Sequence, residues 1–192
     1  CVKTCLSGEV RFNRARRVRN LLNNTENFAH ANWTTAKAGT GVTPIKTPNY
    51  AADPEGNMTA CRVQWDRGAG TTGSDYSFLS QSAGVTDNAT DSVRGSVWMR
   101  TTSSDPVTLW FRVGNTTSGS IITLDSTWSR YSTAVISNTT TANAFFSIGA
   151  YSTSGSTVGD ILIWKPLLES VTGQTNQNPS ESVSNGVLSS PF

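Results

Sequence analysis

Hydrophobic and polar residues alternate with a period of two along much of the chain, most clearly in residues 92–113. This stretch contains two alternating runs, residues 92–100 and 107–113, separated by a segment of Thr, Ser and Asp that ends in Pro106. Such alternation predicts half-buried strands, and the turn residues between the runs predict a hairpin. We therefore expect residues 92–113 to form a long β-hairpin within one sheet.

The arginines indicate which face of each predicted strand is buried. An unpaired charge is costly in an apolar core, so Arg100 and Arg112 are expected to point outwards. Trp98 shares the parity of Arg100, and Trp110 shares that of its neighbour Arg112. The opposite parity, expected in the core, belongs to Val97, Met99, Leu109, Phe111 and Val113. Two tryptophans and two arginines should therefore lie together on the outer face of one sheet, which we take as the candidate functional surface.

Other segments follow the same alternation and predict an all-β protein. Strands are expected at residues 59–65, 76–82, 121–124, 127–135, 144–151 and 160–169. Residues 34–57, which contain several Gly and Pro, are expected to be mostly loop. The absence of helical periodicity and the regular turns favour a two-sheet antiparallel β-sandwich over residues 20–169. Residues 1–19 and the polar residues 170–192 are predicted to be extended arms or linkers.

The N-terminal arm is strongly basic. Residues 1–19 hold six basic residues against one acidic residue, whereas the whole chain of 192 residues has a net charge of +2. Such a segment can dock on an acidic protein surface or serve as a solvated connector, and the scarcity of aromatic residues makes nucleic acid a poorer candidate partner. The candidate docking residues are Arg11, Arg14, Arg16, Arg17 and Arg19.

The sequence contains little that suggests catalysis. The single histidine, His30, lies in a short polar segment, and no motif for a nucleophile, a zinc site or a phosphate loop is present. The carboxylates lie mostly in turns, and no two are paired as a glycosidase would need. We therefore expect a protein that is not an enzyme. Turn carboxylates could hold a structural calcium ion, but no ligand motif is legible, so no metal or cofactor is expected.

The cysteines and the hydropathy of the chain narrow the class of protein further. Three cysteines do not form a disulfide framework; Cys1 and Cys5 could pair, and Cys61 is expected to be a small buried hydrophobic residue. No run approaches the ~20 apolar residues of a membrane-spanning helix.

Several short motifs, taken in order, are similar to a known family. They are Asn20-Leu-Leu, Thr25-Glu26, Trp33-Thr34, the Pro-Glu-Gly-Asn turn before Thr59, Gly95 to Arg100, Trp128 to Ser132, and Gly159 to Trp164. Together they resemble the jelly-roll domains, similar to carbohydrate-binding modules, of bacteriophage virion proteins. The polar tail also resembles junctions in phage structural proteins.

The resemblance implies a jelly roll of about eight strands in two four-stranded sheets. It places the strands at 59–65, 94–100, 107–113 and 144–151 in one sheet, whose outer, concave face would hold a glycan. The implied glycan-binding residues are Trp98, Arg100, Trp110, Arg112 and Tyr151, with Arg62 and Gln64 at the margin.

The chemistry of these residues suits sugar recognition. A tryptophan or tyrosine offers a flat apolar surface to a sugar ring, and arginine and glutamine offer planar hydrogen-bonding groups to its hydroxyls. The leading hypothesis is a non-catalytic structural module of a phage virion, of fibre or decoration type, that is made in the bacterial host cytoplasm and binds host-surface glycans. Its arms would contact other virion proteins. The alternatives are a purely structural domain whose sheet face joins subunits of a homo-oligomer, and a targeting module of a polysaccharide-degrading enzyme.

Overall fold

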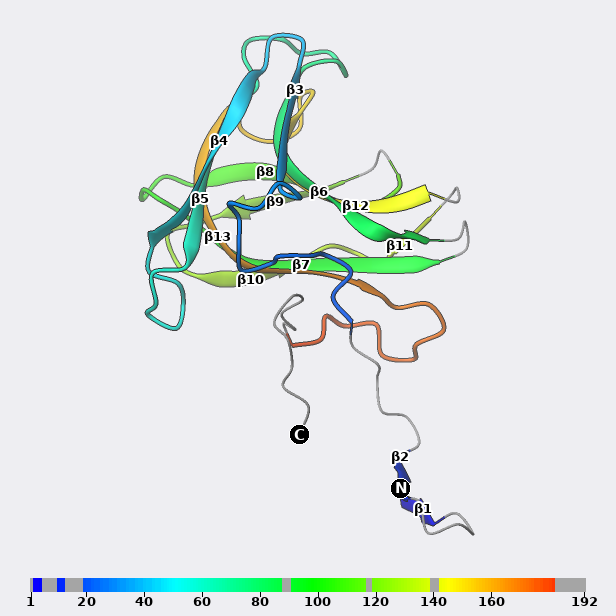
Figure 1. Cartoon of the computed structure of the whole chain (residues 1–192). Helices are drawn as coiled ribbons and strands as arrows, with labels where there is room; N and C mark the ends of the chain where they lie inside the picture. The colour runs from blue at the N-terminus through cyan, green and yellow to red at the C-terminus, as the bar shows by residue number, and fades with distance from the viewer. Residues whose placement is uncertain are drawn as a thin grey trace.

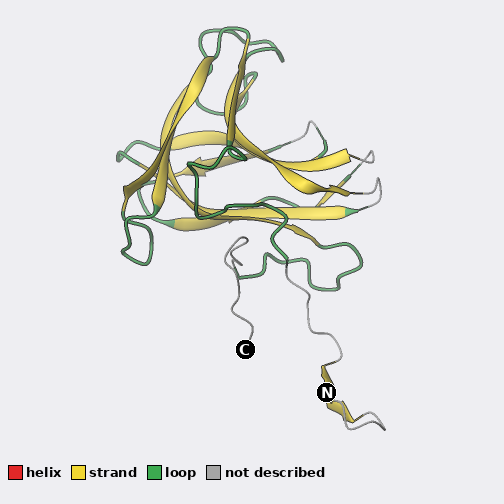
Figure 2. Ribbon diagram, viewed as in Figure 1, coloured by secondary structure: helices red, strands yellow, loops and turns green. Residues whose placement is uncertain are grey.

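The chain folds into a sandwich of two antiparallel β-sheets (Figures 1 and 2). The computed structural model describes residues 2–4, 10–12, 19–87, 91–116, 119–138 and 142–181. Within these residues the elements are all strands, with no helix. The predicted all-β, two-sheet antiparallel sandwich is therefore confirmed.

One sheet has six strands and the other has five, in place of the two four-stranded sheets that were expected. The six-stranded sheet contains, in spatial order, β10 (Ser129–Ser132), β7 (Ser92–Thr101), β13 (Val158–Ser170), β5 (Ala60–Asp66) and β4 (Val42–Ala51), with β11 (Ile136–Ser137) also paired to β7. The five-stranded sheet contains β3 (Thr34–Ala38), β6 (Tyr76–Asp87), β12 (Ala142–Tyr151), β8 (Val107–Gly114) and β9 (Ser120–Leu124). Strands β1 (Val2–Thr4) and β2 (Val10–Phe12) pair separately with each other.

The predicted hairpin over residues 92–113 is wrong, because β7 and β8 belong to opposite sheets. After β7 the backbone bonds to other parts of the chain: Thr101 N–H donates to the Asp125 carbonyl and Thr102 N–H to the Asp160 carbonyl. Residues 102–106 therefore cross from one sheet to the other. Period-two alternation specifies the buried face of a strand but carries no information about its neighbour. The expected grouping of four strands in one sheet fails for the same reason, since β5 and β7 lie opposite β8 and β12.

The prediction of which residues face the core is confirmed. Val97, Met99, Leu109, Phe111 and Val113 are at most 1% exposed and belong to one cluster between the sheets. Aromatic residues from the N-terminal segment extend this cluster: Trp33 packs edge-to-face on Phe146, with ring centroids 5.9 Å apart.

Strands β3 and β4 lie within residues 34–57, which were expected to be mostly loop. Each lies at an edge of its sheet. Pro44 and Pro48 lie within β4, and an edge strand tolerates proline because one side of its backbone needs no ladder partner. The chain passes between the two sheets through the turn that contains Gly39 and Gly41. There Gly39 has a φ of 58°, a left-handed conformation that favours glycine.

Both ends of the described sandwich are fixed at β13. Asn20 donates from Nδ2 to the Pro166 carbonyl at 2.9 Å and accepts the Leu168 N–H at 3.1 Å. Beyond β13, residues 171–181, which we name the C-terminal strap, run along the outer side of the six-stranded sheet (Figure 1). The carboxylate of Glu169, only 2% exposed, accepts both the backbone N–H and the hydroxyl of Ser180, at 2.9 and 3.0 Å. At least this part of the polar tail lies on the domain itself.

Asp75 organises the loop between β5 and β6. Its carboxylate accepts four hydrogen bonds, from the backbone N–H and the hydroxyl of both Thr40 and Thr72, at 2.6–3.0 Å. These hydrogen bonds hold the pKa of Asp75 well below its usual range, and the bond from the Thr72 hydroxyl has the largest effect. The loop leads directly into Tyr76 at the start of β6.

Replacing Asp75 should change how stability depends on pH. Because the folded-state pKa is depressed, this carboxylate contributes its stabilisation above the unfolded-state pKa of about 3.9 and loses it as pH falls below that value. In Asp75→Asn, the free energy of unfolding should therefore fall less steeply than in the parent protein as the pH is lowered from about 5 to below the unfolded-state pKa. Urea denaturation at a series of pH values measures this; parallel curves would show that Asp75 titrates alike in both states.

Trp164 should be a strong determinant of stability although it lies outside the core between the sheets. It is 6% exposed, its indole N–H donates to the Thr59 hydroxyl at 3.0 Å, and the Lys165 ammonium lies 3.9 Å from its ring centroid. Trp164→Ala should cost about 3–5 kcal/mol, the usual range for a large buried aromatic side chain, whereas Trp164→Phe should cost less because it keeps the ring packing. Chemical denaturation gives both values, and a loss below about 1 kcal/mol for the alanine variant would mean that the site collapses without cost.

Candidate functional site

The seven residues predicted to bind glycan do not form one surface. Trp110, Arg112 and Tyr151 lie on β8 and β12, with the outward parity of the five-stranded sheet. Trp98, Arg100, Arg62 and Gln64 lie on β7 and β5, with the outward parity of the six-stranded sheet. The two groups are on opposite outer sides of the sandwich, so a single sugar cannot contact both. This corrects the expected site, and the cause is the misassigned hairpin.

Four aromatic side chains form a continuous group on the outer face of the five-stranded sheet. We name it the aromatic face, consisting of Tyr76, Phe78, Trp110 and Tyr151. Tyr151 stacks on Trp110 with centroids 4.9 Å apart, and Tyr76 stacks on Phe78 at 4.9 Å. Tyr76 and Tyr151 stack at 6.1 Å, and Phe78 meets Trp110 at 5.8 Å. Each ring therefore contacts two others, and the group spans the three adjacent strands β6, β12 and β8.

Gly149 makes this arrangement possible. It lies on the middle strand β12, directly opposite Phe78 on β6 and Trp110 on β8. A Cβ added to Gly149 would lie 2.7 Å from the Phe78 Cβ, and its φ of 151° disfavours other residues. With no side chain between them, Phe78 and Trp110 can touch across β12.

The four rings are not equally open to solvent. Trp110 is 3% exposed, and Gly119 covers its indole so closely that an added Cβ would lie 2.2 Å from Nε1. Tyr76, Phe78 and Tyr151 are partly exposed. Ile121, the cross-strand neighbour of Trp110 on β9, is 52% exposed. Trp110 is therefore the buried member of the aromatic face, and Tyr76, Phe78 and Tyr151 form its accessible surface.

Arg112 borders the aromatic face. Its guanidinium carbon lies 5.8 Å from the Trp110 centroid and 5.3 Å from the Phe145 centroid. Its Nε is buried and, among the described residues, has no hydrogen-bond partner. Burial lowers the pKa of Arg112 from its ordinary value. This side chain is a cation held against rings, with donors that no described protein group uses.

Sequence reasoning missed Tyr76 and Phe78 as members of the aromatic face, and Phe145 as a neighbour of Arg112 at its border. In β6 the sequence pattern does not decide whether Phe78 or Leu79 points inwards, because apolar residues occupy both parities. The structure buries Leu79 and Ala83 completely, which turns Tyr76 and Phe78 outwards. Phe145 shares the parity of Tyr151 in the sequence, but it was not among the predicted binding residues.

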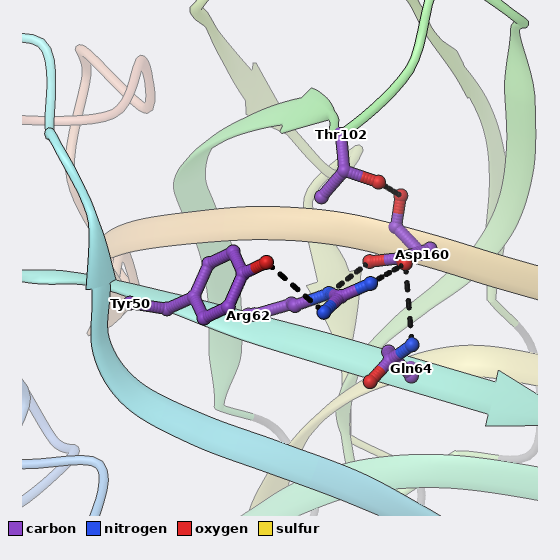
Figure 3. Close-up of polar contacts among 5 residues, drawn as sticks. All are labelled: Tyr50, Arg62, Gln64, Thr102 and Asp160. Atoms are coloured by element: carbon purple, nitrogen blue, oxygen red, sulfur yellow. Dashed lines mark hydrogen bonds and ion pairs between the residues drawn. The ribbon is translucent and has the colours of Figure 1, made fainter.

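The outer face of the six-stranded sheet is instead occupied by internal contacts (Figure 3). Arg62 donates from Nε to Asp160 Oδ1 at 2.8 Å, pairs through Nη2 with Oδ2, and donates to the Tyr50 hydroxyl at 3.1 Å. Gln64 donates to the same carboxylate at 3.2 Å. The hydrogen bonds to Asp160 raise the pKa of Arg62. The donors of Arg62 and Gln64 are thus largely used within the chain.

The C-terminal strap contacts the same outer face. Arg94 donates to the Gln177 carbonyl at 2.8 Å, and Arg130 donates to Ser96 Oγ and to the Ser180 carbonyl. We name this side the strap face.

Trp98 and Arg100 are half-buried on the strap face. Trp98 meets Trp164 edge-on at 6.4 Å, and the Arg100 guanidinium lies 5.5 Å from the Trp128 centroid. They form a smaller aromatic group than the one on the other sheet.

The remaining sequence candidates lie partly outside the described residues. Arg14, Arg16 and Arg17 are outside them, as are Cys1 and Cys5; of Arg11 the backbone is described in β2, and Arg19 is exposed. Their proposed docking role stays a prediction. Cys61 is buried, and burial raises the pKa of its thiol to about 12, as suits a small buried hydrophobic residue.

Apart from Asp160 and Glu169 on the strap face, the carboxylates and the histidine of the described residues contribute little to either face. Across the described part of the chain, no three His, Cys, Asp or Glu residues gather as metal ligands would. Asp53 accepts hydrogen bonds from the backbone of Glu55 and Asn57 and from the Thr59 hydroxyl, so it fixes its own loop. His30 is exposed, and its Nδ1 accepts the Asn32 N–H at 3.2 Å. The described residues also include no helix of the length and hydropathy needed to cross a membrane.

Comparisons with known proteins identify the fold. No protein-family model and no curated protein matches the sequence. Among solved structures, the chain is similar to the CBM22-1 xylan-binding domain of Paenibacillus barcinonensis Xyn10C, with a TM-score of 0.50 and 15% identity over 82% of this chain and 97% of that domain. It is also similar to the CBM22-1-CBM22-2 tandem of that protein, with a TM-score of 0.52 and 16% identity over 89% of this chain and 50% of the tandem.

A further match is the enzymatically active domain of tailspike protein 4 from bacteriophage CBA120, with a TM-score of 0.43 and 13% identity. The match covers 79% of this chain and 21% of the tailspike chain, so this chain spans about a fifth of that chain's length. The two comparisons with Paenibacillus barcinonensis Xyn10C establish the architecture. The chain has the jelly-roll β-sandwich fold of carbohydrate-binding modules.

Proposed function

We propose that this protein is a non-catalytic glycan-binding module and that the aromatic face is its binding surface. The observation that carries the proposal is the group of four mutually contacting rings across β6, β12 and β8, three of them partly exposed. Solvent-facing aromatic residues that are already packed against each other lose little conformational freedom when a ligand covers them. Such a surface suits a flat ligand with apolar faces.

A sugar ring has the required chemistry. Its C–H face can pack on Tyr151, Tyr76 or Phe78, and its hydroxyls can accept hydrogen bonds from Arg112 and exchange them with the tyrosine hydroxyls. The contrast with the strap face supports this choice, because Arg62 and Gln64 already donate to Asp160. The fold shared with a domain described as xylan-binding is compatible with the proposal, although at 15% identity it does not transfer the ligand.

The finer part of the proposal concerns where the module works. We infer a structural module of a phage virion, of fibre or decoration type, that attaches to host-surface glycans. The support is the ordered set of motifs from Asn20 to Glu169 that resembles jelly rolls of phage virion proteins. The basic arm, which carries a net charge of +5 over residues 1–19, would dock the module on an acidic surface of another virion protein.

Removing one exposed ring should weaken glycan binding without unfolding the domain. A glycan array probed with the parent protein identifies a ligand, and calorimetry then compares variants. Tyr151→Ala should lose affinity by about fivefold, because an aromatic contact contributes on the order of 1 kcal/mol. Trp110 is a poorer target, since its burial links binding to stability.

Trp98→Ala is the matched control, because Trp98 is also half-buried and outward-facing but lies on the strap face. It should bind like the parent. The reverse result, with binding lost in Trp98→Ala and kept in Tyr151→Ala, would move the site to the strap face. A parent protein that binds no glycan on a broad array would contradict the proposed function.

The arm should matter for assembly and not for folding. Asn20 is the residue whose side chain fastens the start of the domain to β13, so deleting residues 1–19 should leave the melting temperature nearly unchanged. In particles assembled with the truncated protein, mass spectrometry should find it depleted from purified virions. A large drop in melting temperature would make the arm part of the fold, and normal incorporation would contradict a docking role.

A further inference from the structure

Arg112 differs from the other described groups on its side of the sandwich. The outward side chains described for β3, β6, β8, β9 and β12 are otherwise aromatic, aliphatic, hydroxyl or amide groups. Among the described side chains of outward parity on this sheet, Arg112 is therefore the one positive charge; Lys37 on the edge strand β3 is exposed but has the opposite parity.

The environment of this charge is poorly compensated. Arg112 is half-buried, and its buried Nε has no partner among the described residues. Partial desolvation of a cation costs free energy, which the contacts with the Trp110 and Phe145 rings, at 5.8 and 5.3 Å, offset in part.

The strap face shows how the same chain treats arginines that serve structure. Arg62 forms an ion pair with Asp160 through two of its nitrogens. Arg94 and Arg130 donate to strap carbonyls, and the buried carboxylate of Glu169, the cross-strand neighbour of Arg94 on β13, accepts hydrogen bonds from Ser180 of the strap. These arginines have acceptors within the protein. Arg112, beside the aromatic face, has none among the described residues.

From this contrast we infer that the ligand of the aromatic face is an acidic glycan, whose carboxylate or sulfate group pairs with Arg112 while its sugar rings pack on Tyr151 and its aromatic neighbours. The inference rests on the proposed glycan-binding function. A planar guanidinium fork matches a carboxylate or sulfate, and such charge-assisted hydrogen bonds are roughly twice as strong as those to a neutral hydroxyl. An anion would also restore the compensation that Arg112 lacks in the free protein.

The test compares ligands that differ only in charge. The parent protein is screened on an array of neutral, uronic-acid-containing and sulfated oligosaccharides. The best acidic ligand is then compared by calorimetry with its carboxyl-reduced or desulfated form, which keeps the linkages and removes the charge. The acidic form should bind at least about tenfold more tightly at low salt, and this preference should shrink as salt is raised.

Variants assign the preference to one residue. Arg112→Gln should bind the acidic and neutral forms about equally, whereas Arg112→Lys should keep part of the preference because it retains the charge but not the fork. Arg100→Gln, which changes a half-buried outward arginine on the strap face, should behave like the parent. Circular dichroism establishes whether each variant is folded. If Arg112→Gln does not fold, the comparison of acidic and neutral ligands on the parent protein and on Arg112→Lys still tests whether Arg112 reads the charge.

The outcomes separate the two proposals. A parent protein that binds a neutral glycan as tightly as its acidic counterpart would overturn the acidic-ligand inference and leave glycan binding intact. An acidic preference that survives in Arg112→Gln and disappears in Arg100→Gln would also overturn it, because the charge would be read on the other face. Failure to bind any glycan would remove the proposed function itself.

Discussion

The burial of one face of every strand between two sheets is the constraint on which the molecule depends. Val97, Met99, Leu109, Phe111 and Val113 are almost inaccessible because they occupy that shared core. Since side chains alternate along a strand, filling the core also decides which residues point outwards. Trp98 and Arg100 on β7, and Trp110 and Arg112 on β8, face away from the core as a consequence of what their neighbours bury. The proposed binding surface is therefore fixed by the packing of the interior.

The two outer faces that result have different chemistry. On the strap face, Arg62 donates to Asp160, and the terminal nitrogens of Arg94 and Arg130 donate to Ser96 and to carbonyls of the C-terminal strap. The Nε atoms of Arg94, Arg100 and Arg130 have no partner among the described residues, but each of these guanidinium groups donates through another nitrogen. On the opposite face, rings contact rings, and the Arg112 guanidinium lies near the Trp110 and Phe145 rings, with no hydrogen-bond partner for its Nε among the described residues. A surface whose polar groups already have partners gains little from a ligand, because binding must first break those contacts. This difference, more than the number of aromatic residues, distinguishes a binding surface from a structural one.

The sequence predicted the local properties of this fold better than its pairings. The period-two pattern identified the buried residues of β7 and β8 and the positions of most other strands, because a half-buried strand has an apolar residue at every second position. It did not reveal that β7 and β8 belong to different sheets, since turn residues such as Pro106 occur both in hairpins and in connections between sheets. It also missed β4, because proline is scarce in central strands and the edge position of β4 could not be read from the residues alone. The candidate site inherited the first error: each of its residues points outwards, but they lie on two faces.

Gly149 shows what pattern analysis of single strands cannot detect. In the sequence it is one small residue in an otherwise regular strand, between Ile148 and Ala150, which both face the core. In the sheet it lies between Phe78 and Trp110, and its missing side chain lets rings from two non-adjacent strands meet at 5.8 Å. The gap has meaning only once the neighbours on both sides are known. A surface of this kind is a property of three strands in register, so the absence of one side chain contributes to it as much as the four rings that are present.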